Sequence, residues 1–152
     1  MSLITDIIFV QALRSNKELM NALPKKDVYN TAITIPDDGK DNTALPYIIV
    51  SYNGMKNDDS TKDDSYEGET DNDTVEITIA AETREKLGVI ANAVRKTIHS
   101  YFTSATPDID NYNLVPSDYT MSAGGVMFDQ YKPCMWQILN YACETENNLD
   151  YE

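Results

Sequence analysis

The segment between residues 74 and 102 limits the possible folds of this chain most, because the period of its apolar residues changes within it. Residues 74–81 alternate between apolar and polar side chains, which predicts a strand with one buried and one half-exposed face. Thr83 follows, a residue type that is favoured as a helix N-cap. The apolar residues after it recur at helical spacing: Leu87, Ile90, Ala91, Val94, Ile98 and Phe102. This stripe predicts an amphipathic helix packed on a sheet.

The N-terminal part of the chain predicts one helix and two strands. In residues 3–23 most apolar residues fall at helical intervals; we expect residues 15–16 to interrupt this helix and Pro24 to end it. Residues 28–35 are expected to contain a short edge strand. Residues 47–52 form an unbroken run of β-branched and aromatic residues with one serine, which predicts a strand buried on both faces.

The C-terminal part predicts a pair of strands, residues 119–127 and 133–144, with a bulge at the two glycines 124–125. The predicted order is therefore α-β-β-α-β-β. This order favours an α+β fold, with a mostly antiparallel sheet of about four strands and two main helices packed on one face. The length of 152 residues suits a single domain, which we assign to residues 1–144, followed by an acidic tail at residues 145–152.

The net charge of −13 is concentrated in two segments. Residues 53–73 contain eight carboxylates and two lysines, a net charge of −6, and residues 144–152 add −4. Because dense like charges repel, we expect both segments to be mobile, the first as a loop of about 20 residues between two strands. Such a loop either keeps the protein soluble or orders against a partner. If it orders, the residues of a partner or oligomer interface are Asp58, Asp59, Asp63, Asp64, Glu67, Glu69, Asp71 and Asp73.

The charge also excludes several classes of partner. Nucleic acid and anionic membrane surfaces both require a basic face, so neither is an expected partner. The first residues lack the basic region of a signal peptide, and no apolar stretch approaches the ~20 residues that span a bilayer.

Catalytic motifs are scarce in the sequence. His99 is the single histidine and falls late in the predicted central helix, where a structural role at the helix C-terminus is favoured over catalysis. Cys134 and Cys143 lack metal-ligand spacing and are interpreted as reduced, partly buried thiols. No nucleophile-elbow, phosphate-loop, dinucleotide or zinc-protease motif occurs. We therefore expect no enzyme activity and no cofactor.

The acidic segment has some features of a calcium-binding loop. If the loop began at Asp63, Gly68 would occupy position six, as an EF-hand requires. Position twelve would then be Thr74, which cannot supply the bidentate carboxylate. We therefore predict no dedicated metal site.

Residues 45–102 resemble a known family. The run Leu-Pro-Tyr-Ile-Ile-Val at 45–50, a polar loop, the alternating strand 74–81 and a helix with the centre Ile-Ala-Asn-Ala-Val-Arg at 90–95 are similar to the tail-completion, or tail-terminator, proteins of long-tailed phages and prophages. The very acidic loop and the extended segment 103–117 depart from that pattern.

The resemblance implies a small α+β subunit without catalytic activity. Its expected partners are further copies of itself in a ring, commonly a hexamer, the tail tube protein and the head connector protein. The ring would cap the tail tube and join it to the head. The expected location is the tail or neck of a virion, and the bacterial cytoplasm during assembly.

Three alternatives stay open from the sequence. The chain fits another neck or minor tail protein of the same joint. It also fits an acidic module outside phages that binds a basic protein. The third alternative, a metal-dependent or acid–base enzyme that uses the carboxylate loop, is disfavoured because a mobile loop offers no cleft to separate the pKa values of paired carboxylates.

Overall fold

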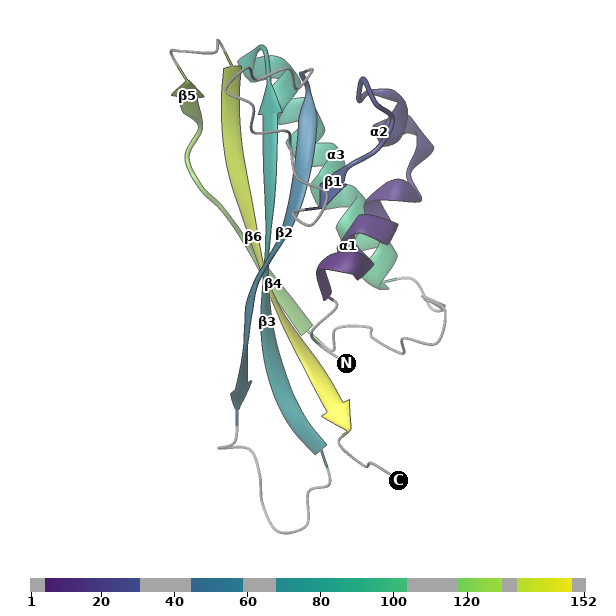
Figure 1. Cartoon of the computed structure of the whole chain (residues 1–152), viewed down its shortest axis with the longest axis vertical. Helices are drawn as coiled ribbons and strands as arrows, with labels where there is room; N and C mark the ends of the chain where they lie inside the picture. Colours follow the sequence, from purple (N-terminus) through teal and green to yellow (C-terminus); the bar gives the residue numbers. More distant parts are fainter. Residues whose placement is uncertain (1–4, 31–44, 59–67, 104–117, 130–133, 149–152) are drawn as a thin grey trace.

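The structure is a computed structural model, and it describes residues 5–30, 45–58, 68–103, 118–129 and 134–148 (Figure 1). The elements follow in chain order: α1 (Thr5–Arg14), α2 (Lys17–Asn21), β1 (Tyr29–Asn30), β2 (Tyr47–Asp58), β3 (Gly68–Ala81), α3 (Arg84–Thr103), β4 (Asp118–Ala123), β5 (Met127–Asp129) and β6 (Cys134–Asn148).

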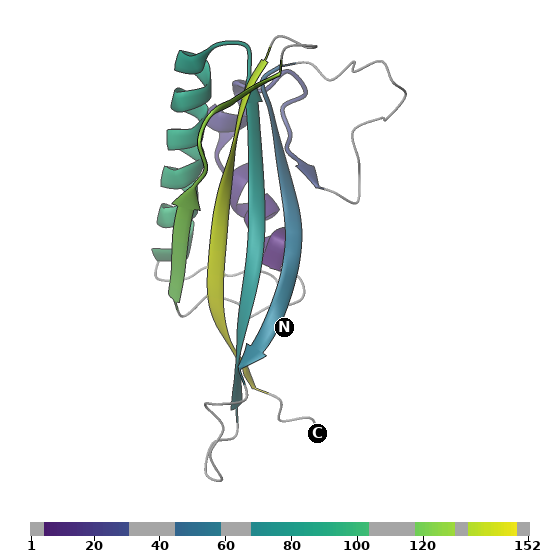
Figure 2. The ribbon, with the colours of Figure 1, turned by 90° about the vertical axis from the view of Figure 1, so that its left-hand side faces the viewer.

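The strands form one sheet in the order β1-β2-β3-β6-β4, and β5 also pairs with β6. All pairings are antiparallel except the short parallel contact of β1 with β2. The helices lie on one face of this sheet (Figure 2). The predicted α+β fold with a mostly antiparallel sheet is therefore confirmed. The sheet has six strands instead of about four, because the short strands β1 and β5 add to it.

The core lies between the helices and the facing side of the sheet. The predicted stripe of α3 is buried at Leu87, Ile90, Val94, Ile98 and Phe102. In β3 the alternate residues Val75, Ile77 and Ile79 are fully buried beneath the helices. An aromatic cluster joins the layers, since the ring centroid of Phe9 lies 5.2 Å from that of Phe102 and 5.1 Å from that of Tyr141.

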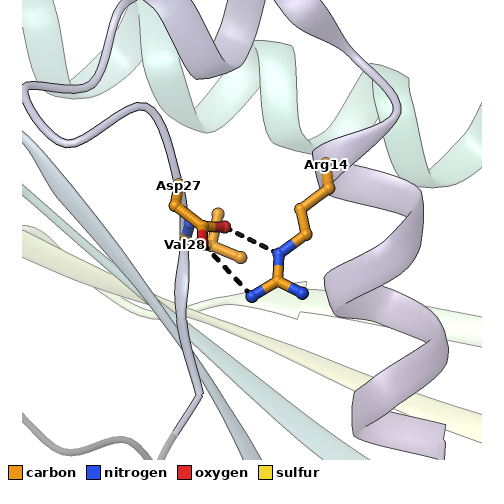
Figure 3. Close-up of polar contacts among 3 residues, drawn as sticks. All are labelled: Arg14, Asp27 and Val28. Atoms are coloured by element: carbon orange, nitrogen blue, oxygen red, sulfur yellow. Dashed lines mark hydrogen bonds and ion pairs between the residues drawn. The ribbon is translucent and has the colours of Figure 1, made fainter.

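The predicted interruption of the first helix is confirmed. Asn16 caps α2, because its side-chain oxygen accepts a hydrogen bond from the backbone N–H of Leu19. Its side-chain nitrogen donates to the hydroxyl of Thr97 at 2.9 Å, which attaches α2 to α3. The end of α1 is held in a different way. The Arg14 guanidinium pairs with the Asp27 carboxylate at 2.6 and 3.3 Å, just before β1 (Figure 3).

Strand β2 corrects one expectation. Ile48 and Val50 are buried, whereas Ile49 and Ser51 on the other face are half-buried. The strand is therefore not buried on both faces, because in the part of the chain that the structure describes the helices cover only one side of the sheet (Figure 2). The unbroken apolar run hid this alternation, since Ile49 is apolar but lies on the open face.

Three predicted boundaries were wrong. Strand β2 continues to Asp58 and strand β3 already begins at Gly68, so both ends of the expected loop 53–73 are strand. Strand β6 continues through Asn148, so the expected tail begins inside it. The hydrogen bonds between strands are made by the backbone, so acidic side chains do not prevent them. From Thr70 onward β3 is paired with β2 on one side and with β6 on the other, and this pairing continues the strands through the acidic residues.

The expected strand 119–127 is divided into β4 and β5. The residues between them, 124–126, carry the predicted irregularity at the glycines. Gly124 remains attached to β6, because its N–H donates to the carbonyl of Ile138 at 2.9 Å. Its own carbonyl accepts from the side chain of Gln137 at 2.7 Å. The edge strand is therefore interrupted at residues 124–126, but hydrogen bonds of Gly124 still hold this segment against β6.

Candidate assembly interface

The ends of β2 and β3 form an extension that we call the acidic arm, comprising residues 53–58 and 68–73. Its strands pair with each other from Met55 opposite Asp73 to Asp58 opposite Thr70. On its other side β3 pairs with β6 as far as Gly68 opposite Asn148. Figure 1 shows that this end of the sheet reaches past the helices. The arm is thus a stranded projection from the body of the protein.

The eight carboxylates predicted as an interface have three different placements. Asp58, Glu69 and Asp71 lie in the strands of the acidic arm. Asp59, Asp63, Asp64 and Glu67 lie outside the described residues. Asp73 differs from both groups, because it is 0% exposed and lies on the core face opposite Cys143.

Asp73 is a buried acceptor at the point where the acidic arm leaves the body. One carboxylate oxygen accepts a hydrogen bond from the hydroxyl of Thr5 at 2.7 Å, at the beginning of α1. The other accepts from the hydroxyl of Tyr52 at 3.1 Å. Burial raises the pKa of the neighbouring Cys143 thiol to about 12, and the charge of Asp73 acts in the same direction. Asp73 therefore anchors the arm and is not available to a partner.

A bulge interrupts the pairing of β2 with β3 between Tyr52 and Met55. Gly54 lies in it with a φ of +108°, a conformation that side chains with a Cβ rarely adopt. The bulge marks the place where the arm begins, and its geometry depends on glycine.

A second surface is a groove between α3 and β4, about 1060 Å³ in volume, which we call the α3–β4 groove. Residues from the exposed side of α3 form one wall, and strands β4 and β6 form the other. Its lining comprises Val89, Asn92, Ala93, Arg95, Lys96, His99, Ser100, Tyr119, Met121 and Tyr141. None of these lining residues, all in the described part of the chain, is an aspartate or glutamate.

Two tyrosine hydroxyls lie at the groove in different states. That of Tyr119 is 2.7 Å from Nδ1 of His99, so the histidine packs against β4. That of Tyr141 is buried and has no hydrogen-bond partner in the described part of the chain. Burial raises the pKa of both tyrosines, while the charge of Arg95 acts in the opposite direction on each. The guanidinium of Arg95 therefore acts electrostatically on both phenols.

Apolar side chains are exposed at the same edge of the sheet. Val126, Met127 and Phe128 follow the glycines, and Phe128 is 62% exposed. Val89 on α3 is 69% exposed at the α3–β4 groove. Exposed apolar residues that gather on one side are typical of protein interaction surfaces.

The fold is similar to that of a known virion protein. A solved chain from a structure described as the virion of a native gene transfer agent (GTA) particle matches with a TM-score of 0.52 and 17% sequence identity. The match covers 93% of this chain and 94% of that chain. No model of a protein family matches the sequence, and no curated protein matches it. The likeness shows a shared fold across nearly the whole of both chains.

Two features are absent from the described residues. They contain no helix that is long and apolar enough to cross a membrane. They contain no group of three or more histidine, cysteine, aspartate or glutamate side chains placed to hold a metal ion. Both cysteines lie outside any disulfide, and both are buried where partly buried thiols were predicted.

Sequence reasoning missed the α3–β4 groove and the role of Asp73. The groove joins residues of α3 to residues of β4 and β6, and no local pattern reports that contact. The sequence contains a signal that Asp73 is buried, because it lies two residues before Val75 and four before Ile77 and therefore shares their face of the strand. The acidic composition of the neighbouring residues masks this signal.

Proposed function

We propose that this chain is a structural subunit of a phage-like virion, and within it the ring that caps the tail tube and joins it to the head connector. The observation that carries the proposal is the shared fold with a chain of the GTA virion over nearly the full length of both chains. The sequence resemblance to tail-terminator proteins supports the more specific role. The protein acts without catalysis, by shape and contact.

The arrangement of the surfaces suits a ring. A closed ring is built from head-to-tail contacts, so each subunit needs two different patches that are complementary to each other. This chain presents an acidic arm at one end of the sheet and an acid-free groove beside α3. Two unlike patches on one compact subunit favour such a contact over a symmetric dimer.

Electron microscopy of a lysate from which this protein has been deleted tests the proposal. We expect tails of uncontrolled length that lack heads, and restoration of normal particles when the gene is supplied on a plasmid. Tails of normal length that lack heads would favour the alternative, another neck or minor tail protein of the joint. Normal particles with heads attached would contradict both roles.

A further inference from the structure

We propose that the α3–β4 groove binds the acidic arm of a second copy of this chain. The inference rests on the proposed function and specifies which two surfaces meet in the ring. Three features support this contact: the lining of the groove, one unsatisfied buried hydroxyl and the direction of the arm.

The lining of the groove differs in charge from the rest of the chain. The protein has 25 acidic and 12 basic residues, yet the groove presents Arg95 and Lys96 without an acidic neighbour among its lining residues. The adjoining hollow toward the start of α3 adds Arg84 and again has no acidic lining residue in the described structure. Exposed Val89 and half-buried Met121 contribute apolar surface. The groove therefore fits a carboxylate-rich segment with some apolar contact.

The hydroxyl of Tyr141 supplies a second, independent observation. Tyr141 is 1% exposed, lines the groove and has no hydrogen-bond partner for its hydroxyl among the described residues. Buried hydroxyls are almost always hydrogen-bonded, because leaving one unsatisfied is unfavourable. A carboxylate is acceptor-only and forms a strong hydrogen bond with a phenol. An incoming aspartate or glutamate would accept from this hydroxyl and pair with Arg95, whose charge already acts on the Tyr141 phenol.

The acidic arm of the same copy points away from this groove. The pairing of β4 with β6 ends where Asp118 lies opposite Glu144, whereas β3 and β6 remain paired to Gly68 opposite Asn148. The arm thus continues along the sheet past the end of β4, and Figure 1 shows that it extends beyond the ends of the helices. The donor of the carboxylates is therefore a neighbouring copy. A contact between two unlike surfaces repeats around a ring until it closes.

Photo-cross-linking tests the contact directly. A benzoylphenylalanine placed at Asn92, an exposed lining residue, is irradiated in the purified protein at high concentration and in assembled particles. We expect a product of two copies whose linked peptide comes from the acidic arm, residues 53–58 or 68–73. The matched control carries the same group at Glu85, which is exposed on α3 but absent from the groove lining, and should give little product.

Charge reversal provides the second test. Arg95→Glu with Lys96→Glu should lower the yield of the two-copy product about tenfold, because like charges then face each other. Glu69→Lys with Asp71→Lys in the arm should do the same, and mixing the two reversed proteins should restore the yield. Tyr141→Phe removes only the hydroxyl and should lower the yield severalfold in a protein that stays folded.

Three results would overturn the inference: a linked peptide from residues 144–152, a linked peptide from another protein, or no two-copy product in either preparation. The proposed function fails separately, through normal tails in the deletion lysate. The two tests therefore distinguish a virion protein whose copies meet through other surfaces from a protein that makes this contact but has no role in a virion.

Discussion

Replacing Asp73 with asparagine should weaken the attachment of the acidic arm to the body. The substitution keeps the size of the side chain but removes its charge and one acceptor oxygen. Thr5 and Tyr52 each donate to a different carboxylate oxygen, at 2.7 and 3.1 Å, so one of these two donors then faces an amide N–H₂. Both Thr5 and Asp73 are buried, so water does not replace the lost bond.

The expected loss follows from these contacts. A hydrogen bond to a charged group contributes about 1.5–3 kcal/mol, and a buried donor without a partner costs about 1–3 kcal/mol. One bond is lost and the other is weakened, so Asp73→Asn should lower the free energy of unfolding by about 2–4 kcal/mol. Thr5→Val, which keeps the volume, should cost about 1.5–3 kcal/mol by removing the shorter bond.

Urea denaturation followed by the fluorescence of Trp136, the single tryptophan, measures these changes. The double variant Asp73→Asn with Thr5→Val completes a double-mutant cycle. If the bond is real, the two losses overlap, with a coupling energy of about 1 kcal/mol or more. Strictly additive losses, or a loss below about 0.5 kcal/mol for Asp73→Asn, would refute the argument that this carboxylate anchors the arm.

Three further changes have expected outcomes. Gly54→Ala forces a Cβ onto a φ of +108° and should cost about 1–3 kcal/mol in the same urea assay; alanine at Gly125, whose added Cβ meets no atom within 4 Å, is the control. Tyr141→Phe should leave the free energy of unfolding unchanged or raise it by about 1 kcal/mol, since an unpartnered buried hydroxyl is lost, and a clear destabilisation would show a missing partner. Because burial raises the pKa of Cys143 from 9.0 to about 12, the folded state holds this proton longer than the unfolded state. The corresponding stability is complete below pH 9 and falls by about 1.4 kcal/mol per pH unit between pH 9 and 12, a slope that Cys143→Ala should reduce.

The elements that the sequence predicted best are those whose pattern is local. The alternation of β3 and the apolar stripe of α3 each follow from the period of one segment, and both are present with the predicted buried residues except Ala91, which is half-buried. Thr83 caps α3 as expected, because its hydroxyl accepts from the N–H of Lys86. Strand ends were predicted less well, since the acidic residues at 53–58 and 68–73 carry a loop-like composition while the neighbouring strands keep them paired.

The residues of the α3–β4 groove could not be predicted from the sequence. Arg95 and Tyr141 are 46 residues apart, and only the packing of α3 against β4 and β6 brings both to one groove. Nor does composition mark Tyr141 as special, because the chain has ten tyrosines and the state of one hydroxyl depends on its surroundings. Long-range proximity and hydrogen-bond satisfaction are properties of the folded chain, which explains why the sequence indicated an acidic segment but not the α3–β4 groove.

The uneven charge of the chain has a physical consequence for assembly. Copies that each carry a charge of −13 repel, yet the proposed ring requires them to touch. At physiological ionic strength the Debye length is about 8 Å, so repulsion between the bodies of neighbouring copies is largely screened, while ions in contact within a groove are screened much less. Most of the negative charge lies near residues 53–73 and 144–152, and the groove beside Arg95 has no acidic lining residue in the described structure. In the proposed ring, this distribution keeps free subunits apart in solution, while the contact between groove and arm stays attractive at short range.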